Sequence, residues 1–168
     1  MTNNLVVDIS VDQMSGKTLS EQVIAELSSV ARRAWTSVNY TISRAEISLL
    51  ITDDVQIRKL NKRYRNIDRA TNVLSFVCDN DATLSAGSAP VLVGDIVLGC
   101  GVIAREATVH GKSFSDHMCH LVVHGVLHLA GYDHKSRAEA DEMRALEISI
   151  LAEGGIGDPY INWIDGQL

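Results

Sequence analysis

The sequence of 168 residues is poor in proline and cysteine, and each shortage excludes a type of organisation. Its two prolines, Pro90 and Pro159, lie outside any Pro/Ser/Gly-rich tract that would mark a linker between domains. Its three cysteines form no C-x-x-C pair, and an odd number does not fit a closed disulfide framework. We therefore expect a single domain spanning residues 1–168, with reduced cysteines, in the cytoplasm.

Long apolar runs and targeting segments are also missing. The longest apolar stretch, Ile96 to Ala104, contains two glycines and is far shorter than the roughly 20 residues of a membrane span. The N-terminus has no basic start followed by an apolar stretch, so we expect neither a signal peptide nor a membrane partner. The formal net charge of −6 argues against indiscriminate coating of nucleic acid.

Hydrophobic periodicity predicts short strands early in the chain and helices late. The predicted strands are Leu5–Ile9, Ala45–Thr52, Val73–Val77 and Val91–Cys100. Helices are predicted after a capping box of Thr18 and Glu21, after Asp53-Asp54, over Ile103–His110, from Ser113 to Leu129, and after Ser136. The fold class we expect is α+β, a small mixed sheet of about four strands packed with about five helices.

The strongest chemical signal is H-x3-H-x5-H, formed by His124, His128 and His134. Four residues on a helix turn the chain by about 400°, so the first two imidazoles face the same way. Gly131 is suited to end that helix, after which His134 can fold back as a third ligand. Three imidazoles with one open position are typical of a catalytic zinc site, although nickel, copper and iron also accept them.

The metzincin peptidases have the same ligand spacing, but they carry a glutamate general base directly after the first histidine. Here that position is Gly125, which disfavours peptide hydrolysis. His117 and His120 lie on the same predicted helix, and we expect them at the mouth of the cleft or facing solvent. A fourth ligand would have to come from Cys119 or His120. Asp133 or Asp95 could orient a ligand imidazole.

A second signal is the segment 58–69, which contains six basic residues and a single acid, Asp68. The basic residues are Arg58, Lys59, Lys62, Arg63, Arg65 and Arg69. Charge alone fits either a solvated helix face or a phosphate-binding strip beside the metal. Because the run is so basic, the rest of the chain is more acidic than the net charge suggests.

Several ordered motifs give the chain a resemblance to the YbeY endoribonucleases, metal-dependent bacterial proteins of ribosome maturation. The similar region extends from about Ile47 to Glu153. Its motifs are Leu60-Asn61 with Tyr64-Arg65, Asp68 to Phe76, Gly94 to Val97, Arg105 to Ala107, Gly111 to Ser113, His124 to His134 and the helix through Glu139, Ala140, Met143 and Glu147. One departure is Ala70, where the family usually has proline, which loosens a turn but removes no functional group.

The resemblance implies that His124, His128 and His134 bind one zinc ion and that Arg65 is the arginine needed for RNA cleavage. It also implies an endoribonuclease that prefers single strands, matures the 3′ end of 16S rRNA and serves ribosome quality control. The implied partners are single-stranded and ribosomal RNA, the small ribosomal subunit and its assembly factors. Arg58, Lys59, Lys62, Arg63 and Arg69 would then grip flanking phosphates.

Two chemical routes are open for such a site. Either a metal-bound water or the 2′-hydroxyl of the RNA attacks the phosphodiester, and Arg65 stabilises the charge that grows on the phosphate. Two other functions also fit the ligand set. One is a zinc metallopeptidase, and the other is a ribosome-assembly factor whose zinc is structural.

Overall fold

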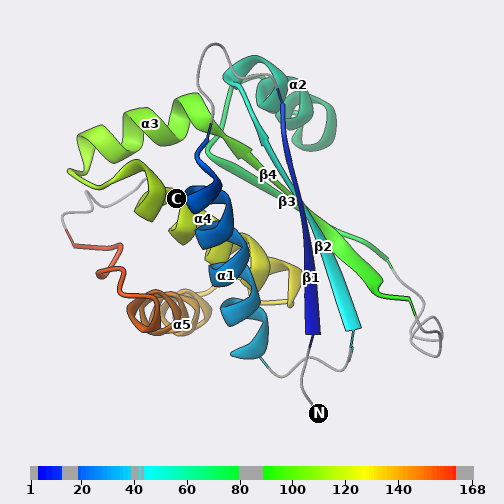
Figure 1. Ribbon diagram of the computed structural model, residues 1–168. Coiled ribbons are helices and arrows are strands. Elements are labelled where there is room, and N and C mark those ends of the chain that lie inside the picture. The colour runs from blue at the N-terminus through cyan, green and yellow to red at the C-terminus, as the bar shows by residue number, and fades with distance from the viewer. Residues whose placement is uncertain (1–3, 13–18, 39–41, 43, 80–88, 162–168) are drawn as a thin grey trace.

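A computed structural model describes residues 4–12, 19–38, 42, 44–79 and 89–161. Its four-stranded sheet has the order β1-β2-β4-β3 (Figure 1). Strands β1, β2 and β4 are parallel, and β3 runs antiparallel to β4 at one edge. The strands are β1 (Asn4–Val11), β2 (Arg44–Thr52), β3 (Val73–Val77) and β4 (Val91–Gly99). The expected α+β class with a small mixed sheet is confirmed.

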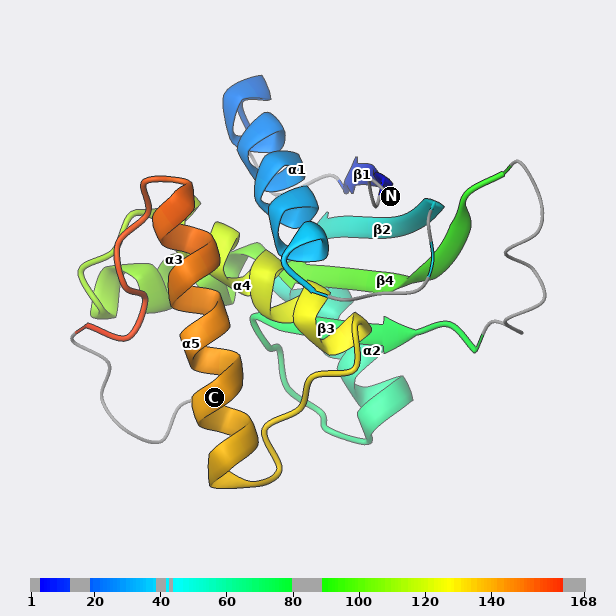
Figure 2. The ribbon, with the colours of Figure 1, turned by 90° about the horizontal axis from the view of Figure 1, so that it is seen from below.

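The described residues form five helices, which cover the two faces of the sheet unequally (Figure 2). The main core lies between the sheet and the layer that contains α1 and α4, while α2 packs on the opposite face through Ile57 against Leu74 and Val97. The helices are α1 (Glu21–Thr36), α2 (Asp54–Arg65), α3 (Cys100–Val109), α4 (Phe114–Leu129) and α5 (Arg137–Glu153). None of these helices has the length and apolarity needed to cross a membrane.

Helix α4 is the central helix, with α1, α3 and α5 packed around it and the sheet beneath it. Its residues are buried without a break from His117 to Leu127, and the buried surface includes a stripe of histidines as well as apolar side chains. Gly125 allows the close approach to the sheet, because a Cβ built there would lie only 2.9 Å from Cδ1 of Ile96. The helix ends before Gly131, whose φ of +94° turns the chain back toward the histidines.

Short-range capping signals define most helix starts. Asp53, Ser113 and Ser136 cap α2, α4 and α5 as expected, and Ser136 forms a full capping box with Glu139. The box predicted from Thr18 and Glu21 is wrong, since α1 begins at Glu21. The helix is capped by the side chain of Ser20, and Thr18 lies outside the described residues.

The end of β4 also differs from the prediction. The strand stops at Gly99 and α3 starts at Cys100, so the helix begins three residues before Ile103. Gly99 has no side chain with which to cap α3, but Asp54 accepts a hydrogen bond from the backbone N–H of Val102 in its first turn. The cap therefore comes from a distant helix, which local sequence patterns do not reveal.

Candidate metal centre and cleft

Three histidine side chains converge at the end of α4. His124 and His128 lie one turn apart on α4, and His134 lies in the turn that leads to α5. One nitrogen from each ring lies within 4.8 Å of the other two. Within the described ranges, this is the single group of His, Cys, Asp or Glu side chains placed to hold a metal ion. Because His124 is buried and His134 is exposed, the group is open to solvent on one side.

The hydrogen bonds of two of these rings show which nitrogens face the metal position. His124 donates from Nδ1 to Oε1 of Glu147 at 2.7 Å, and His128 donates from Nδ1 to the carbonyl oxygen of Tyr132 at 3.0 Å. Because a carboxylate and a carbonyl only accept, both Nδ1 atoms carry the proton. The two Nε2 atoms, 3.0 Å apart, then present lone pairs to each other. Such a donor set fits a divalent cation such as zinc.

The surroundings of His128 favour the neutral form of its ring. Burial of His128, together with the neighbouring His124 and His134, lowers its pKa to about 4. A neutral imidazole is the form that binds metal. His128 is therefore a competent ligand well below the pH at which an isolated histidine would be protonated.

Glu147, from α5, is the buried carboxylate behind the cluster. Besides His124 it accepts a hydrogen bond from Nε2 of His120 at 3.0 Å, and the hydroxyl of Tyr160 also donates to it. Burial opposes ionisation, but the hydrogen bonds from His120 and His124 hold the pKa of Glu147 below its usual range. Glu147 is therefore an anion that fixes the orientation of His124.

The expectation that His117 and His120 face the cleft mouth or solvent is wrong, since both are 1% exposed. His120 binds Glu147, and Nε2 of His117 lies 2.8 Å from Oε2 of Glu106 on α3. Burial opposes ionisation of Glu106, but hydrogen bonds from His117 and Asn72 lower its pKa. One face of α4 thus holds four histidines, and three of them, His117, His120 and His124, are hydrogen-bonded to carboxylates from other helices.

The other expected helpers of the metal site do not take the predicted positions. Asp133 accepts a hydrogen bond from the backbone N–H of His134 and pairs with Lys135, rather than with a ligand ring. Cys119 is buried in the main core, where burial raises the pKa of its thiol to about 12. Among the described residues Asp95 makes no hydrogen bond to a ligand ring, and Glu147 and Tyr132 take this role.

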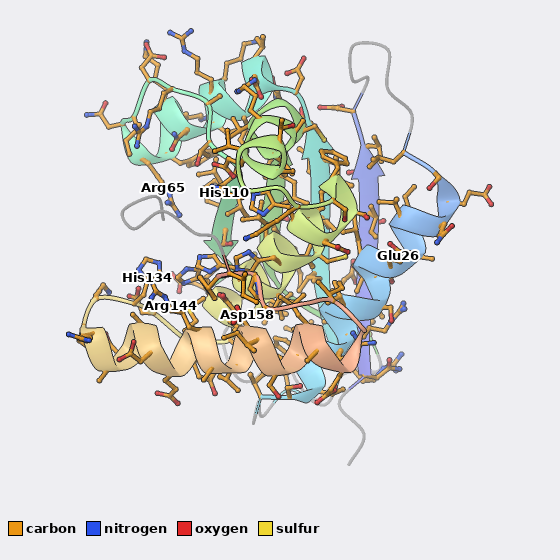
Figure 3. The ribbon with its side chains drawn as sticks, turned by 90° about the vertical axis from the view of Figure 1, so that its left-hand side faces the viewer. Glu26, Arg65, His110, His134, Arg144 and Asp158 are labelled. Carbon is orange, nitrogen blue, oxygen red and sulfur yellow. The ribbon has the colours of Figure 1, made fainter. Side chains whose placement is uncertain are left out.

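A cavity of about 710 Å³ opens in front of the histidines. Arg65 at the end of α2 and His134 lie on this face of the molecule (Figure 3). The lining includes Arg65, Arg69, Arg105, Glu106, His110 and the three clustered histidines. Asn66 ends α2 in the left-handed conformation, with a φ of 58°, and the chain turns there so that Arg65 and Arg69 line the same cavity.

The remaining basic residues of the 58–69 segment lie outside this lining. Arg58 and Lys62 both bind Asp68, at 2.8 and 2.9 Å, and their hydrogen bonds lower the pKa of Asp68 to about 2. Arg63 lies over the ring of Tyr64, with its guanidinium carbon 5.4 Å from the ring centroid. The structure therefore divides the basic run into two cavity arginines and a group on the outer surface of α2.

Two features of this site were missed from sequence. Glu147 was noted only as part of a helical pattern, although it supports a ligand 23 residues away. Glu106 was noted only in a motif, although it lines the cavity. A buried acid on the apolar face of α5 is the signal that would have identified Glu147, since buried carboxylates require partners.

Comparison with known proteins supports the fold and gives the family. A profile described as "Endoribonuclease YbeY" matches residues 8–155. The protein of that name from Rhodopseudomonas palustris is 42% identical over 158 residues, which cover 92% of this chain and 80% of the relative. That from Bradyrhizobium diazoefficiens is 43% identical over 161 residues, covering 95% and 85%.

A solved structure has the same fold. The solution structure of a Thermotoga maritima protein superimposes with a TM-score of 0.53 at 21% identity, over 97% of this chain and 100% of that one. The sequence matches extend across the sheet, the histidine helix and α5. The chain therefore belongs to the YbeY endoribonuclease family.

Proposed function

We propose that this protein is a zinc-dependent endoribonuclease that cleaves single-stranded RNA, with His124, His128 and His134 as the ligands of one zinc ion. The observation that carries the proposal is the opening of a three-imidazole cluster into a cavity lined by Arg65 and Arg69. Imidazoles that meet at one point suit a divalent metal, and guanidinium groups beside them suit a phosphodiester. Family membership supports RNA as the substrate.

The cellular role we propose is maturation of the 3′ end of 16S rRNA and ribosome quality control, in the cytoplasm. Its partners would be the small ribosomal subunit and its assembly factors. This part of the proposal is supported by the family resemblance. An open metal site also favours an enzyme over an assembly factor with structural zinc, because structural zinc sites have four protein ligands.

The residues of the site would have separate roles in phosphodiester cleavage. Arg65 would bind the scissile phosphate and stabilise the negative charge that grows on its oxygens. Arg69 would hold a neighbouring phosphate, and the outer residues Arg58, Lys59, Lys62 and Arg63 would contact the strand farther from the cut. Glu147 and the carbonyl of Tyr132 keep the Nε2 atoms of His124 and His128 directed at the metal position.

A bound zinc ion would supply a Lewis acid and a water of lowered pKa, so that either this water or the 2′-hydroxyl of the RNA can act as nucleophile. Within the described residues, no carboxylate follows the first ligand to serve as a base, since that position is Gly125. Gly125 packs against Ile96 of the sheet, so a side chain there would point into the core. This geometry disfavours a metallopeptidase.

The test is to incubate the purified protein with single-stranded ribosomal RNA and with casein, each with and without a chelator. Cleavage of RNA that the chelator abolishes, and that zinc restores, is expected. His124→Ala protein prepared in parallel controls for contaminating ribonuclease and should be inactive. Equal RNA cleavage by that variant, or cleavage of casein alone, would refute the proposal.

A further inference from the structure

Glu106 presents a carboxylate to the cavity in which the proposed function places RNA. A quarter of its side chain is exposed, at 25%. A carboxylate repels phosphate, so this part of the wall does not suit the RNA backbone. It suits groups that donate hydrogen bonds, and an unpaired strand offers these on its base edges and its 2′-hydroxyls.

The fold holds this carboxylate in one orientation. Its Oε2 accepts from Nε2 of His117 at 2.8 Å and from Nδ2 of Asn72 at 3.1 Å. His117 is buried on α4, and Asn72 is fixed because its Oδ1 accepts from the backbone N–H of Val73 at 2.7 Å. Among the described residues, Oε1 receives only a 3.4 Å contact from Asn72, so its acceptor capacity remains available.

The position of Glu106 relative to the metal cluster suits a neighbouring nucleotide. His117, which binds Glu106, precedes His124 by seven residues on α4, or about 10 Å along the helix axis. Glu106 therefore lines the same cavity as the three clustered histidines, beside the helix turn of His117 rather than beside that of His124. This position suits contact with the base of a nucleotide next to the scissile phosphate.

We propose that Glu106 is a specificity-determining residue that reads this base by accepting a hydrogen bond at Oε1. Guanine, adenine and cytosine each carry an exocyclic amino group, whereas uracil places carbonyl oxygens on both sides of its one N–H. The subsite therefore accepts bases with an amino group and rejects uracil. The inference rests on the proposed function, because it concerns the substrate of the same cavity.

The variant Glu106→Gln gives a sharp test because it reverses the hydrogen-bonding character of one atom. His117 and Asn72 both donate to this side chain, so the amide oxygen of glutamine must take the place of Oε2. The amide NH₂ then replaces Oε1 and donates to the cavity. A donor there suits the carbonyl oxygens of uracil and no longer suits an amino group, so the preference should invert.

The measurement is the base frequency at each position around the cut after zinc-loaded protein has cleaved a random-sequence single-stranded RNA. Wild type should disfavour uracil at one subsite by roughly tenfold, as expected for a hydrogen bond to a charged group. Glu106→Gln should favour uracil there, and Glu106→Ala should show no preference. Glu142→Gln, the same change on an exposed part of α5, should behave as wild type.

A second readout does not depend on cleavage. Binding of 2′-O-methyl oligonucleotides that differ only in one cytosine-to-uracil exchange should show the same inversion between wild type and Glu106→Gln. An unchanged base preference in Glu106→Gln would overturn the inference while metal-dependent RNA cleavage still supports the proposed function. Loss of binding on 2′-O-methylation with no base preference would assign Glu106 to the ribose and also overturn it. Absence of RNA cleavage by wild type would refute both.

Discussion

At the scale of single residues, the candidate site depends on hydrogen bonds that fix ring orientation. His124 is held by Glu147 and His128 by the Tyr132 carbonyl, so each Nε2 is preset toward the metal position before any ion arrives. Preset donors lower the entropic cost of binding and raise affinity. The spacing of the three histidines could be read from sequence, because it is a local helical pattern followed by a glycine turn. The role of the Glu147 carboxylate could not be read from sequence, because its contact with His124 joins two separate helices, α5 and α4.

Replacement of Glu147 tests this support. Glu147→Gln should weaken zinc binding by roughly 10- to 100-fold, because the amide attracts the His124 proton less strongly than the carboxylate. Competition with a chromophoric chelator measures the affinity, and Glu142→Gln on the exposed surface of α5 is the matched control. Equal affinity in the two variants would show that Glu147 does not support the metal site.

The depressed pKa of His128 makes the metal-free protein sensitive to acid. Below pH 6.5 the unfolded chain takes up a proton at His128 that the folded protein excludes until about pH 4, so its contribution to stability is lost as the pH falls through this window. We expect the urea midpoint of chelated protein to decrease between pH 6.5 and 4. The decrease should be smaller in His128→Gln, and an identical decrease in both proteins would contradict this account.

Charge reversal at Arg65 separates phosphate binding from folding. Arg65→Glu should retain bound zinc and the wild-type circular dichroism spectrum but lose at least about 100-fold in RNA cleavage, since it would remove the charge that we propose stabilises the transition state. Lys59→Glu makes the same change on α2 outside the cavity lining and should have a much smaller effect. Equal losses in both variants would mean that general attraction, rather than a site-specific contact, is responsible.

At the scale of elements, the contact between α4 and β4 determines what chemistry the helix can offer. Gly125 lies against Ile96, so the residue after the first ligand points into the core and away from the cavity. The sequence shows that position 125 has no glutamate. Only the packing of α4 on the sheet explains why glycine is needed there. The burial of His117 and His120 could not be predicted for the same reason. Helical periodicity shows that the histidines share one face of α4, but it does not show which elements pack on that face.

A methyl group at Gly125 tests the packing. Gly125→Ala should lower the free energy of unfolding by about 1–3 kcal/mol, because the new Cβ overpacks against Ile96. Gly157→Ala is the control, since a Cβ there meets no atom within 4 Å. Urea denaturation measures both, and a neutral Gly125→Ala would show that the interface between α4 and β4 can relax.

At the scale of the whole molecule, net charge concealed the distribution of charge. The chain is acidic overall, yet its longest basic run supplies two arginines to the cavity of an otherwise acidic protein. Composition alone suggested a poor partner for RNA. Fold class could be predicted, because strand and helix periodicities and three of the caps are local signals. The division of the basic residues between the cavity and the outer surface of α2 could not be predicted from the sequence, because it depends on the turn at Asn66.

Salt dependence counts the phosphates that the molecule contacts. If all six basic residues contact the strand, as the proposed function holds, the slope of log affinity against log salt should be about −4 for single-stranded RNA, from about −0.7 per phosphate. A slope of about −1.4 would limit the close contacts to Arg65 and Arg69. Fluorescence anisotropy with a non-cleavable oligonucleotide measures the slope, and an affinity independent of salt would exclude this segment as the binding surface.

The location of Glu147 on α5 has a consequence for the protein's own synthesis. A ribosome releases the chain from its N-terminus, so Arg65 and Arg69 emerge first, the three histidines follow, and the carboxylate that orients His124 comes after them. Tyr160, which also binds Glu147, emerges later still. The proposed RNA-cleaving site would therefore lack the carboxylate that holds His124 for as long as α5 is inside the ribosome, which is the period when the nascent chain is held next to ribosomal RNA.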